Sequence, residues 1–177
     1  MMSKISYEIS QNNNELILLK EGKKTPLLTS FWYMEFGKTC AEIKEDNDKL
    51  LYSVTKKFQF WKWKMVYLIF KNGGEKSILI SQNTRNTVFK IELLNSVYQI
   101  KVNYKKKKSI YKDTTKIAEF DESFLATNNI KLLVADSGEL QILFLLYTSL
   151  FIGINDLKSK TALKSQKQLE KNTEAWF

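Results

Sequence analysis

Lysine is the side chain through which this sequence could do most of its chemistry. The chain of 177 residues holds 28 basic and 19 acidic residues, has a net charge of +9 and contains no histidine. All but one of the basic residues, Arg85, are lysines. Ammonium groups attract phosphates, whether on nucleic acid or on anionic lipid headgroups. Two dense groups supply the candidate phosphate-binding residues: Lys62, Lys64, Lys105, Lys106, Lys107 and Lys108.

The lysine excess also has a second interpretation. Abundant Lys, Asn and Ile with almost no Arg is the composition that AT-rich coding sequence produces, and the lysines would then only solvate loops. Specific phosphate recognition usually favours the bidentate fork of arginine, which this chain nearly lacks. Both the phosphate-binding and the loop-solvating interpretation therefore stay open.

The lysines at 62 and 64 alternate with aromatic residues in the segment Phe58–Met65, FQFWKWKM. Such interleaving is typical of a stacking platform for single-stranded nucleic acid, or of a loop at a membrane interface. It is also typical of a core strand that leaves the core midway. Strict alternation would place 58, 60, 62 and 64 on one face and 59, 61, 63 and 65 on the other. We favour the core strand.

The absence of histidine removes most of the alternatives to binding. Ser-His-Asp and Cys-His mechanisms are closed, and a zinc or haem site of the usual kind is not expected. The single Cys40 excludes an internal disulfide and is expected to be a small buried hydrophobe. Carboxylates cluster at Glu42–Asp48 and Asp121–Glu122 in polar, turn-like segments, where a glycosidase-type pair remains an alternative. We predict no enzymatic activity, no catalytic residue, no cofactor and no metal.

One long apolar run decides which elements position these side chains. Residues 142–154, ILFLLYTSLFIGI, carry no charge. A membrane-spanning helix needs a longer apolar run, of roughly 20 residues. Asp136 precedes the run as a capping residue, and Glu139 stands where it could reach back to the cap. We therefore predict a helix over 139–157 buried in protein, with a membrane span and a pair of buried strands as alternatives.

Short apolar or alternating runs, separated by turn residues at intervals of about ten residues, precede this helix. The candidate strands are 4–9, 15–20, 27–36, 40–44, 49–54, 57–61, 65–71, 76–81, 87–94, 97–104, 109–112, 116–120 and 130–135. About a dozen antiparallel strands would close into a barrel whose lumen is too wide for its own side chains. We predict that the helix fills this lumen and that residues 1–157 form one mainly β domain.

This element order resembles the tubby C-terminal-like superfamily, which includes the LURP-one-related proteins and the phospholipid scramblases. The phrase Tyr104–Phe120, YKKKKSIYKDTTKIAEF, is similar to the strand pairs that recur in that family. The resemblance spans about residues 1–157. It implies a barrel closed around its helix that binds anionic phospholipid or phosphoinositide headgroups, in a cytoplasmic protein peripheral to the membrane.

Two other functions stay open at this point. A nucleic-acid-binding β protein would use the same basic surface together with Phe58–Lys64, and a protein-interaction or structural domain would need no small ligand. The start, MMSKISYEIS, has no apolar h-region, so we expect no signal peptide. The Lys-rich tail 158–177 extends past the expected domain. We expect it to be helical or partly disordered, and it offers a site for a protein partner.

Overall fold

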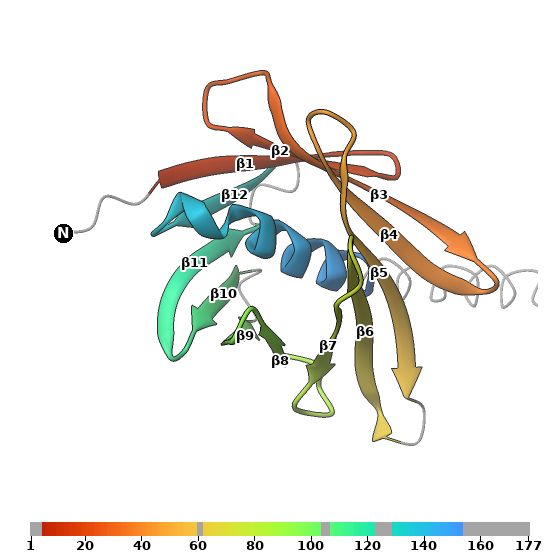
Figure 1. Cartoon of the computed structure of the whole chain (residues 1–177). Helices are drawn as coiled ribbons and strands as arrows, with labels where there is room; N and C mark the ends of the chain where they lie inside the picture. The colour runs from red at the N-terminus through yellow and green to blue at the C-terminus, as the bar shows by residue number, and fades with distance from the viewer. Residues whose placement is uncertain (1–4, 60–61, 104–106, 123–128, 154–177) are drawn as a thin grey trace, which may run out of the picture.

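A computed structural model describes residues 5–59, 62–103, 107–122 and 129–153. Its strands form one closed antiparallel barrel in which each strand pairs with its neighbours in sequence and β1 pairs with β12 (Figure 1). The strands are β1 (Ile5–Asn12), β2 (Glu15–Lys20), β3 (Pro26–Glu35), β4 (Lys38–Glu45), β5 (Leu50–Gln59), β6 (Lys64–Lys71), β7 (Lys76–Ser81), β8 (Val88–Leu93), β9 (Ser96–Val102), β10 (Lys107–Lys112), β11 (Thr115–Asp121) and β12 (Asn129–Val134).

Alternation along each strand turns one apolar face inward, as the sequence pattern requires. In β2, Leu16 and Leu18 are fully buried while their neighbours are partly exposed. Turn residues with positive φ join the strands, among them Gly73 and Gly74 between β6 and β7, where an L side chain would be strained. The predicted antiparallel closed barrel is confirmed.

A helix whose described part covers residues 140–153 runs through the barrel (Figure 1). It follows a short 3₁₀ turn, Ser137–Glu139, whose first residues are capped by the Asp136 side chain accepting from the Gly138 N–H. Phe144 and Leu146 are fully buried. The helix therefore fills the barrel as predicted, and the alternative of two buried strands is wrong. The predicted residues 154–157 and the tail 158–177 lie outside the described residues.

Among the residues that the structure places, no helix has the length and apolarity that a bilayer crossing requires.

Two predicted strands, 49–54 and 57–61, are one continuous strand, β5. The prediction left Thr55 and Lys56 between the two strands, and the predicted residues 60–61 lie outside the described residues. The Lys56 stem instead lies inside the barrel, and its ammonium donates to the carbonyl oxygen of Gly153 at 3.2 Å. A buried ammonium group needs a hydrogen-bond acceptor, and this carbonyl supplies one.

The interpretation of Phe58–Met65 as one strand is also wrong, whereas the core placement of Phe58, Phe60 and Trp61 lies outside the described side chains. β5 and β6 pair in the register Phe58↔Met65 and Gln59↔Lys64, so the chain reverses within this segment. Met65 is buried, whereas the Trp63 side chain is 60% exposed in the turn. The reversal cancels the alternation on which the prediction was based.

The antiparallel order gives the barrel two distinct ends. The helix begins at one end, which we call the helix-start rim; it holds the turns β2/β3, β4/β5, β6/β7, β8/β9 and β10/β11. The helix runs toward the opposite end, the helix-end rim, where the odd-numbered strands end. In Figure 1 the β3/β4 and β5/β6 hairpins extend beyond the body of the barrel at this second rim.

Candidate functional site

The fold brings the two predicted lysine groups to the same end of the molecule. Lys62 and Lys64 lie in or next to the β5/β6 turn, and Lys107 and Lys108 begin β10, so all four belong to the helix-end rim. Lys62 is exposed and Lys64 is half-buried. Lys105 and Lys106 lie outside the described residues. Strand order places Lys62, Lys64, Lys107 and Lys108 at the same rim, and the spacing of these residues in the sequence did not reveal this.

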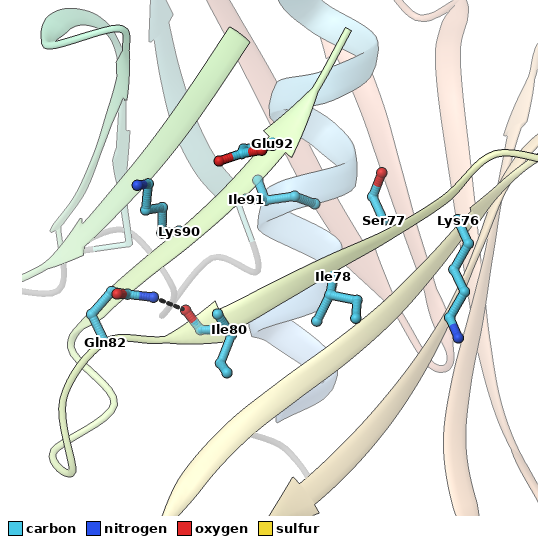
Figure 2. A pocket seen from close by; sticks show the side chains of 8 residues that line it. All are labelled: Lys76, Ser77, Ile78, Ile80, Gln82, Lys90, Ile91 and Glu92. Carbon is cyan, nitrogen blue, oxygen red and sulfur yellow. Dashed lines mark hydrogen bonds between the residues drawn. The ribbon is translucent and has the colours of Figure 1, made fainter. Parts of the chain in front are cut away.

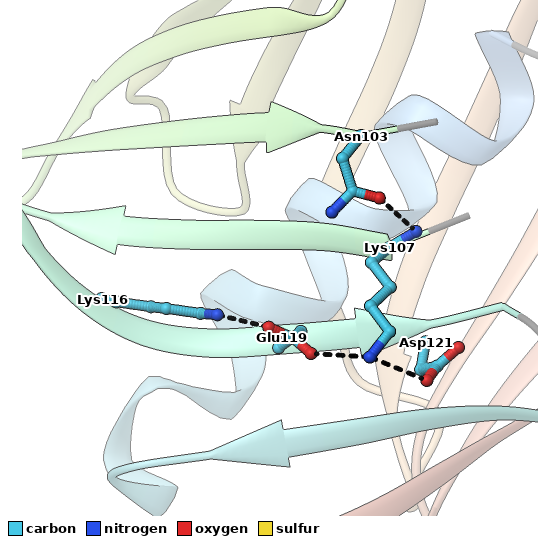
Figure 3. A network of polar contacts seen from close by, with 5 residues as sticks. All are labelled: Asn103, Lys107, Lys116, Glu119 and Asp121. Atoms are coloured by element: carbon cyan, nitrogen blue, oxygen red, sulfur yellow. Dashed lines mark hydrogen bonds and ion pairs between the residues drawn. The ribbon is translucent and has the colours of Figure 1, made fainter. Parts of the chain in front are cut away.

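Lys107 is held by two carboxylates of β11. Its Nζ lies 3.4 Å from Glu119 Oε1 and 3.4 Å from Asp121 Oδ2 (Figure 3). The nearby charge of Asp121 and the hydrogen bonds to both carboxylates raise the pKa of Lys107. Lys116 also pairs with Glu119, and this contact lowers the pKa of the Glu119 carboxyl. The charge of Lys107 is therefore largely matched within the sheet, although its predicted phosphate contact stays a prediction.

Lys108 lies inside the barrel wall, with only 2% of its side chain exposed. Its ammonium forms an ion pair with Glu122, and Glu122 Oε1 accepts a hydrogen bond from the Tyr147 hydroxyl at 2.8 Å. The ammonium also lies 5.4 Å from the centre of the Tyr147 ring. Burial and the adjacent Glu122 raise the pKa of Tyr147 well above its usual value. Lys108, Glu122 and Tyr147 thus form a buried cluster that ties β10 to the central helix.

A second cluster of the same three residue types lies at the helix-start rim. Tyr98 donates to Glu139 Oε2 at 2.8 Å, and Lys112 donates to Glu139 Oε1 at 2.5 Å. Lys112 is 34% exposed against 2% for Lys108, whereas Glu139 and Glu122 are exposed to nearly the same extent, 15% and 13%. The predicted capping role of Glu139 is corrected, because its carboxylate binds Tyr98 and Lys112 from the barrel wall. Burial and the bond to Glu139 raise the pKa of Tyr98 to about 12.

Large apolar side chains are exposed at the hairpin tips of the helix-end rim. Phe36 is 95% exposed, Met34 is 70% exposed and Trp63 is 60% exposed. Phe36 and Trp63 also have positive φ angles of 46° and 50°. Asn or Gly is expected at such positions, since a bulky side chain there is strained. Their side chains are not buried and the backbones of Phe36 and Trp63 are strained, so these residues do not stabilise the fold. This indicates a role in binding.

Sequence reasoning missed Phe36 and Met34 because both lie in what reads as an ordinary strand. The one available signal was the dipeptide Phe36-Gly37, which occupies a hairpin turn where Asn-Gly is typical. Trp63 was singled out, but for the core. The β7/β8 loop supports its hairpin, since the Asn86 side chain accepts from the Met65 N–H at 3.0 Å and donates to the Trp63 carbonyl at 3.5 Å.

Exposed basic side chains surround these apolar tips. They are Lys38 beside Phe36, Lys57 and Lys62 flanking the β5/β6 turn, and Arg85 in the β7/β8 loop. None of the ion pairs found within the described residues involves these four. The turns of the opposite rim mix both signs, with carboxylates at Asp46, Asp48, Glu75 and Asp113 next to Lys23, Lys24 and Lys49. On the helix-end rim, the exposed Glu35 lies opposite Lys38 in the β3/β4 hairpin, so the apolar tips are combined with a net excess of positive charge.

The predicted carboxylate clusters are engaged in local contacts. Glu42 lies 3.6 Å from Lys44 and accepts from the Tyr33 hydroxyl at 3.4 Å. Glu45 accepts from the Gln141 side chain at 2.9 Å. Within the described ranges, no three Cys, Asp or Glu side chains are grouped so that they could hold a metal ion. Cys40 is buried as predicted, with its sulfur 3.7 Å from Thr55 Oγ1.

No family model, curated protein or solved structure matches this chain.

Proposed function

We propose that this protein is a non-enzymatic domain that docks on anionic membrane surfaces through its helix-end rim. The observation that carries the proposal is the exposure of Met34, Phe36 and Trp63 on hairpin tips among basic residues. Aromatic side chains favour the headgroup region of a bilayer, and cationic side chains favour its anionic lipids. The helix-end rim offers both kinds of side chain.

The expected energies are sufficient for peripheral binding. Each basic side chain near an anionic surface contributes about 1 kcal/mol, so the four exposed ones contribute about 4 kcal/mol. Partial burial of the three apolar tips adds about 3 to 4 kcal/mol, given ~1.5 to 3 kcal/mol for complete burial of one side chain. The sum corresponds to a dissociation constant in the micromolar range. Neutral bilayers would lose the first term and bind more weakly.

We also keep the tubby-like resemblance as a proposal, in which the lipid headgroup is the ligand. The candidate lysines of this proposal are Lys62 and Lys64 with Lys105, Lys106, Lys107 and Lys108. Because Lys107 and Lys108 already contact carboxylates, we assign the larger electrostatic contribution to Lys38, Lys57, Lys62 and Arg85. A cytoplasmic, membrane-peripheral location follows from the same proposal.

A flotation assay tests the proposed function. Vesicles of phosphatidylserine and phosphatidylcholine are compared with pure phosphatidylcholine vesicles and with single-stranded oligonucleotides, at low and high salt. We expect binding to the anionic vesicles alone, weakened by salt because exposed charges are screened. Binding to oligonucleotide alone would instead establish the nucleic-acid alternative, and binding to neither would contradict both.

Matched variants locate the docking surface in the same assay. Lys38→Gln with Lys62→Gln should weaken vesicle binding about thirtyfold, since each removes about 1 kcal/mol of attraction. Lys23→Gln with Lys24→Gln removes the same charge from the helix-start rim, where both lysines are exposed. Equal losses in the two pairs would show that only net charge matters and would refute a rim-specific surface.

A further inference from the structure

The barrel wall has one short ladder, between β7 and β8. Their register contains only Ile80↔Lys90 and Ser81↔Phe89, whereas β6 pairs with β7 over five residue pairs and β8 with β9 over six. Figure 2 shows β7 and β8 diverging from Gln82, with the central helix behind the space between them. The two strands therefore separate toward the helix-start rim.

The register shows which backbone groups face this gap. Lys71 N–H donates to the Glu75 carbonyl, and Gln82 N–H donates to the Val88 carbonyl. Because hydrogen-bonded pairs alternate along antiparallel strands, Ser77 and Leu79 direct their backbone groups toward β6. Ile78 directs its N–H and carbonyl toward β8, at a level that the β7–β8 ladder does not reach. The gap thus presents the edge of a strand.

Side chains around the gap form a groove of about 400 Å³. Its outer wall consists of Lys76, Ile78, Ile80, Lys90 and Glu92, and Ser77 and Ile91 lie deeper (Figure 2). Ile78 is 48% exposed. In the turn that follows β8, Leu94 is 59% exposed and has a φ of 49°. A strained, exposed leucine in this turn is a second, independent indication of an interaction at this rim.

We propose that an extended acidic strand of a partner protein inserts beside β7 in this gap. A polypeptide strand matches the spacing of the backbone groups of an open edge, and such strand addition is an established mode of peptide recognition. Its side chains would alternate between the barrel interior and the solvent. Apolar side chains would face Ile91, and acidic side chains would lie beside Lys76 and Lys90. This site lies on the opposite half of the barrel from the membrane-docking rim and does not depend on it.

Amide hydrogen exchange of the full chain tests the proposal, with a capped peptide of alternating valine and glutamate as the probe. In the free protein, the Ile78 amide should exchange much faster than the Leu79 amide, which is bonded to β6. Saturating peptide should slow the exchange of Ile78 by at least about tenfold, while Leu79 changes little. A peptide of the same sequence with a methyl group on every backbone nitrogen has the same charge but no N–H and cannot pair as a strand, so it should have no such effect.

Two variants separate the backbone from the side chain. Ile78→Pro removes the N–H that faces the gap while leaving the β6 ladder intact, as proline allows at a strand edge. It should weaken peptide binding about fivefold to tenfold relative to Ile78→Ala, because one backbone hydrogen bond is lost. Strong protection of Ile78 in the free protein, an unchanged Ile78 exchange rate on adding peptide, or equal protection by the N-methylated peptide would each overturn the proposal.

Discussion

The two ends of the barrel contain the same interior cluster but differ in exposure and in what surrounds them. At the helix-end rim, Lys108 and Tyr147 are buried and the Glu122 side chain is 13% exposed. At the helix-start rim, Lys112 and Glu139 are partly solvated over a buried Tyr98. Lys108 and Lys112 are four residues apart on the inward face of one strand, β10. Burial, rather than residue type, therefore sets the contribution of each pair to stability.

The outer surfaces differ in the opposite direction. The helix-end rim has the buried cluster inside and strained aromatic residues outside, at Phe36 and Trp63. A rigid interior at this end would hold the hairpin tips in a fixed arrangement, as a docking surface requires. The solvated helix-start rim instead adjoins the gap between β7 and β8. The contrast suggests that the protein meets a membrane at one end and a polypeptide at the other.

The largest difference between the ends should appear on removing each lysine. Lys108→Met leaves Glu122 and Tyr147 buried without their cation, and we expect a loss of about 3 to 5 kcal/mol in the free energy of unfolding. Lys112→Met should cost much less, because the Lys112 side chain is 34% exposed and water screens its charge. Urea denaturation measures both.

A double variant checks the cause of that loss. Lys108→Met with Glu122→Gln removes the stranded charge and should recover much of the stability lost in Lys108→Met. If Lys108→Met costs no more than Lys112→Met, burial does not distinguish the two clusters.

The next largest expected effect is the loss of stability that alkaline pH causes at the helix-start cluster. The Tyr98 pKa is about 12 in the folded protein against 10.0 for an unperturbed tyrosine. Stability from this group is present below pH 10 and is lost as pH rises toward 12, because only the unfolded chain releases the proton in that window. We expect a loss on the order of 2 kcal/mol. Thermal melts of Tyr98→Phe should decline less steeply than those of the wild type over this range, and parallel declines would exclude this role for Tyr98.

The smallest effect concerns the strained tips. Phe36→Asn places a residue that tolerates positive φ in a turn that favours Asn-Gly, so stability should rise by about 0.5 to 1 kcal/mol. Leu94→Asn at the opposite rim should gain a similar amount, since Leu94 shares the same backbone conformation. Only Phe36→Asn should also weaken vesicle binding. Chemical denaturation of both variants, beside flotation, separates backbone strain from docking.

The barrel and its filling helix could be predicted because hydrophobic alternation and an uncharged apolar run are local properties of the sequence. The interruption predicted at Thr55 and Lys56 is wrong, because Lys56 continues β5 and its partner, the Gly153 carbonyl, lies 97 residues away in the chain. Lys108 was predicted to lie on the surface and is buried instead. Nothing in the run KKKK indicates that Glu122 and Tyr147 will contact one of its lysines. The exposure of the aromatic side chains at the hairpin tips could be recognised only once the turn geometry was known. Long-range partners, rather than secondary structure, limited the prediction of the site.

The central question is which end of the barrel contacts the bilayer. The emission of an environment-sensitive fluorophore attached at either end tests this directly. In a Cys40→Ala background, the fluorophore is attached either to Met34→Cys at the helix-end rim or to Leu94→Cys at the helix-start rim, both exposed positions. Phosphatidylserine vesicles should shift the emission of the Met34 label to shorter wavelength and leave the Leu94 label unchanged. A shift at Leu94 alone, or at neither position, would contradict docking through the helix-end rim.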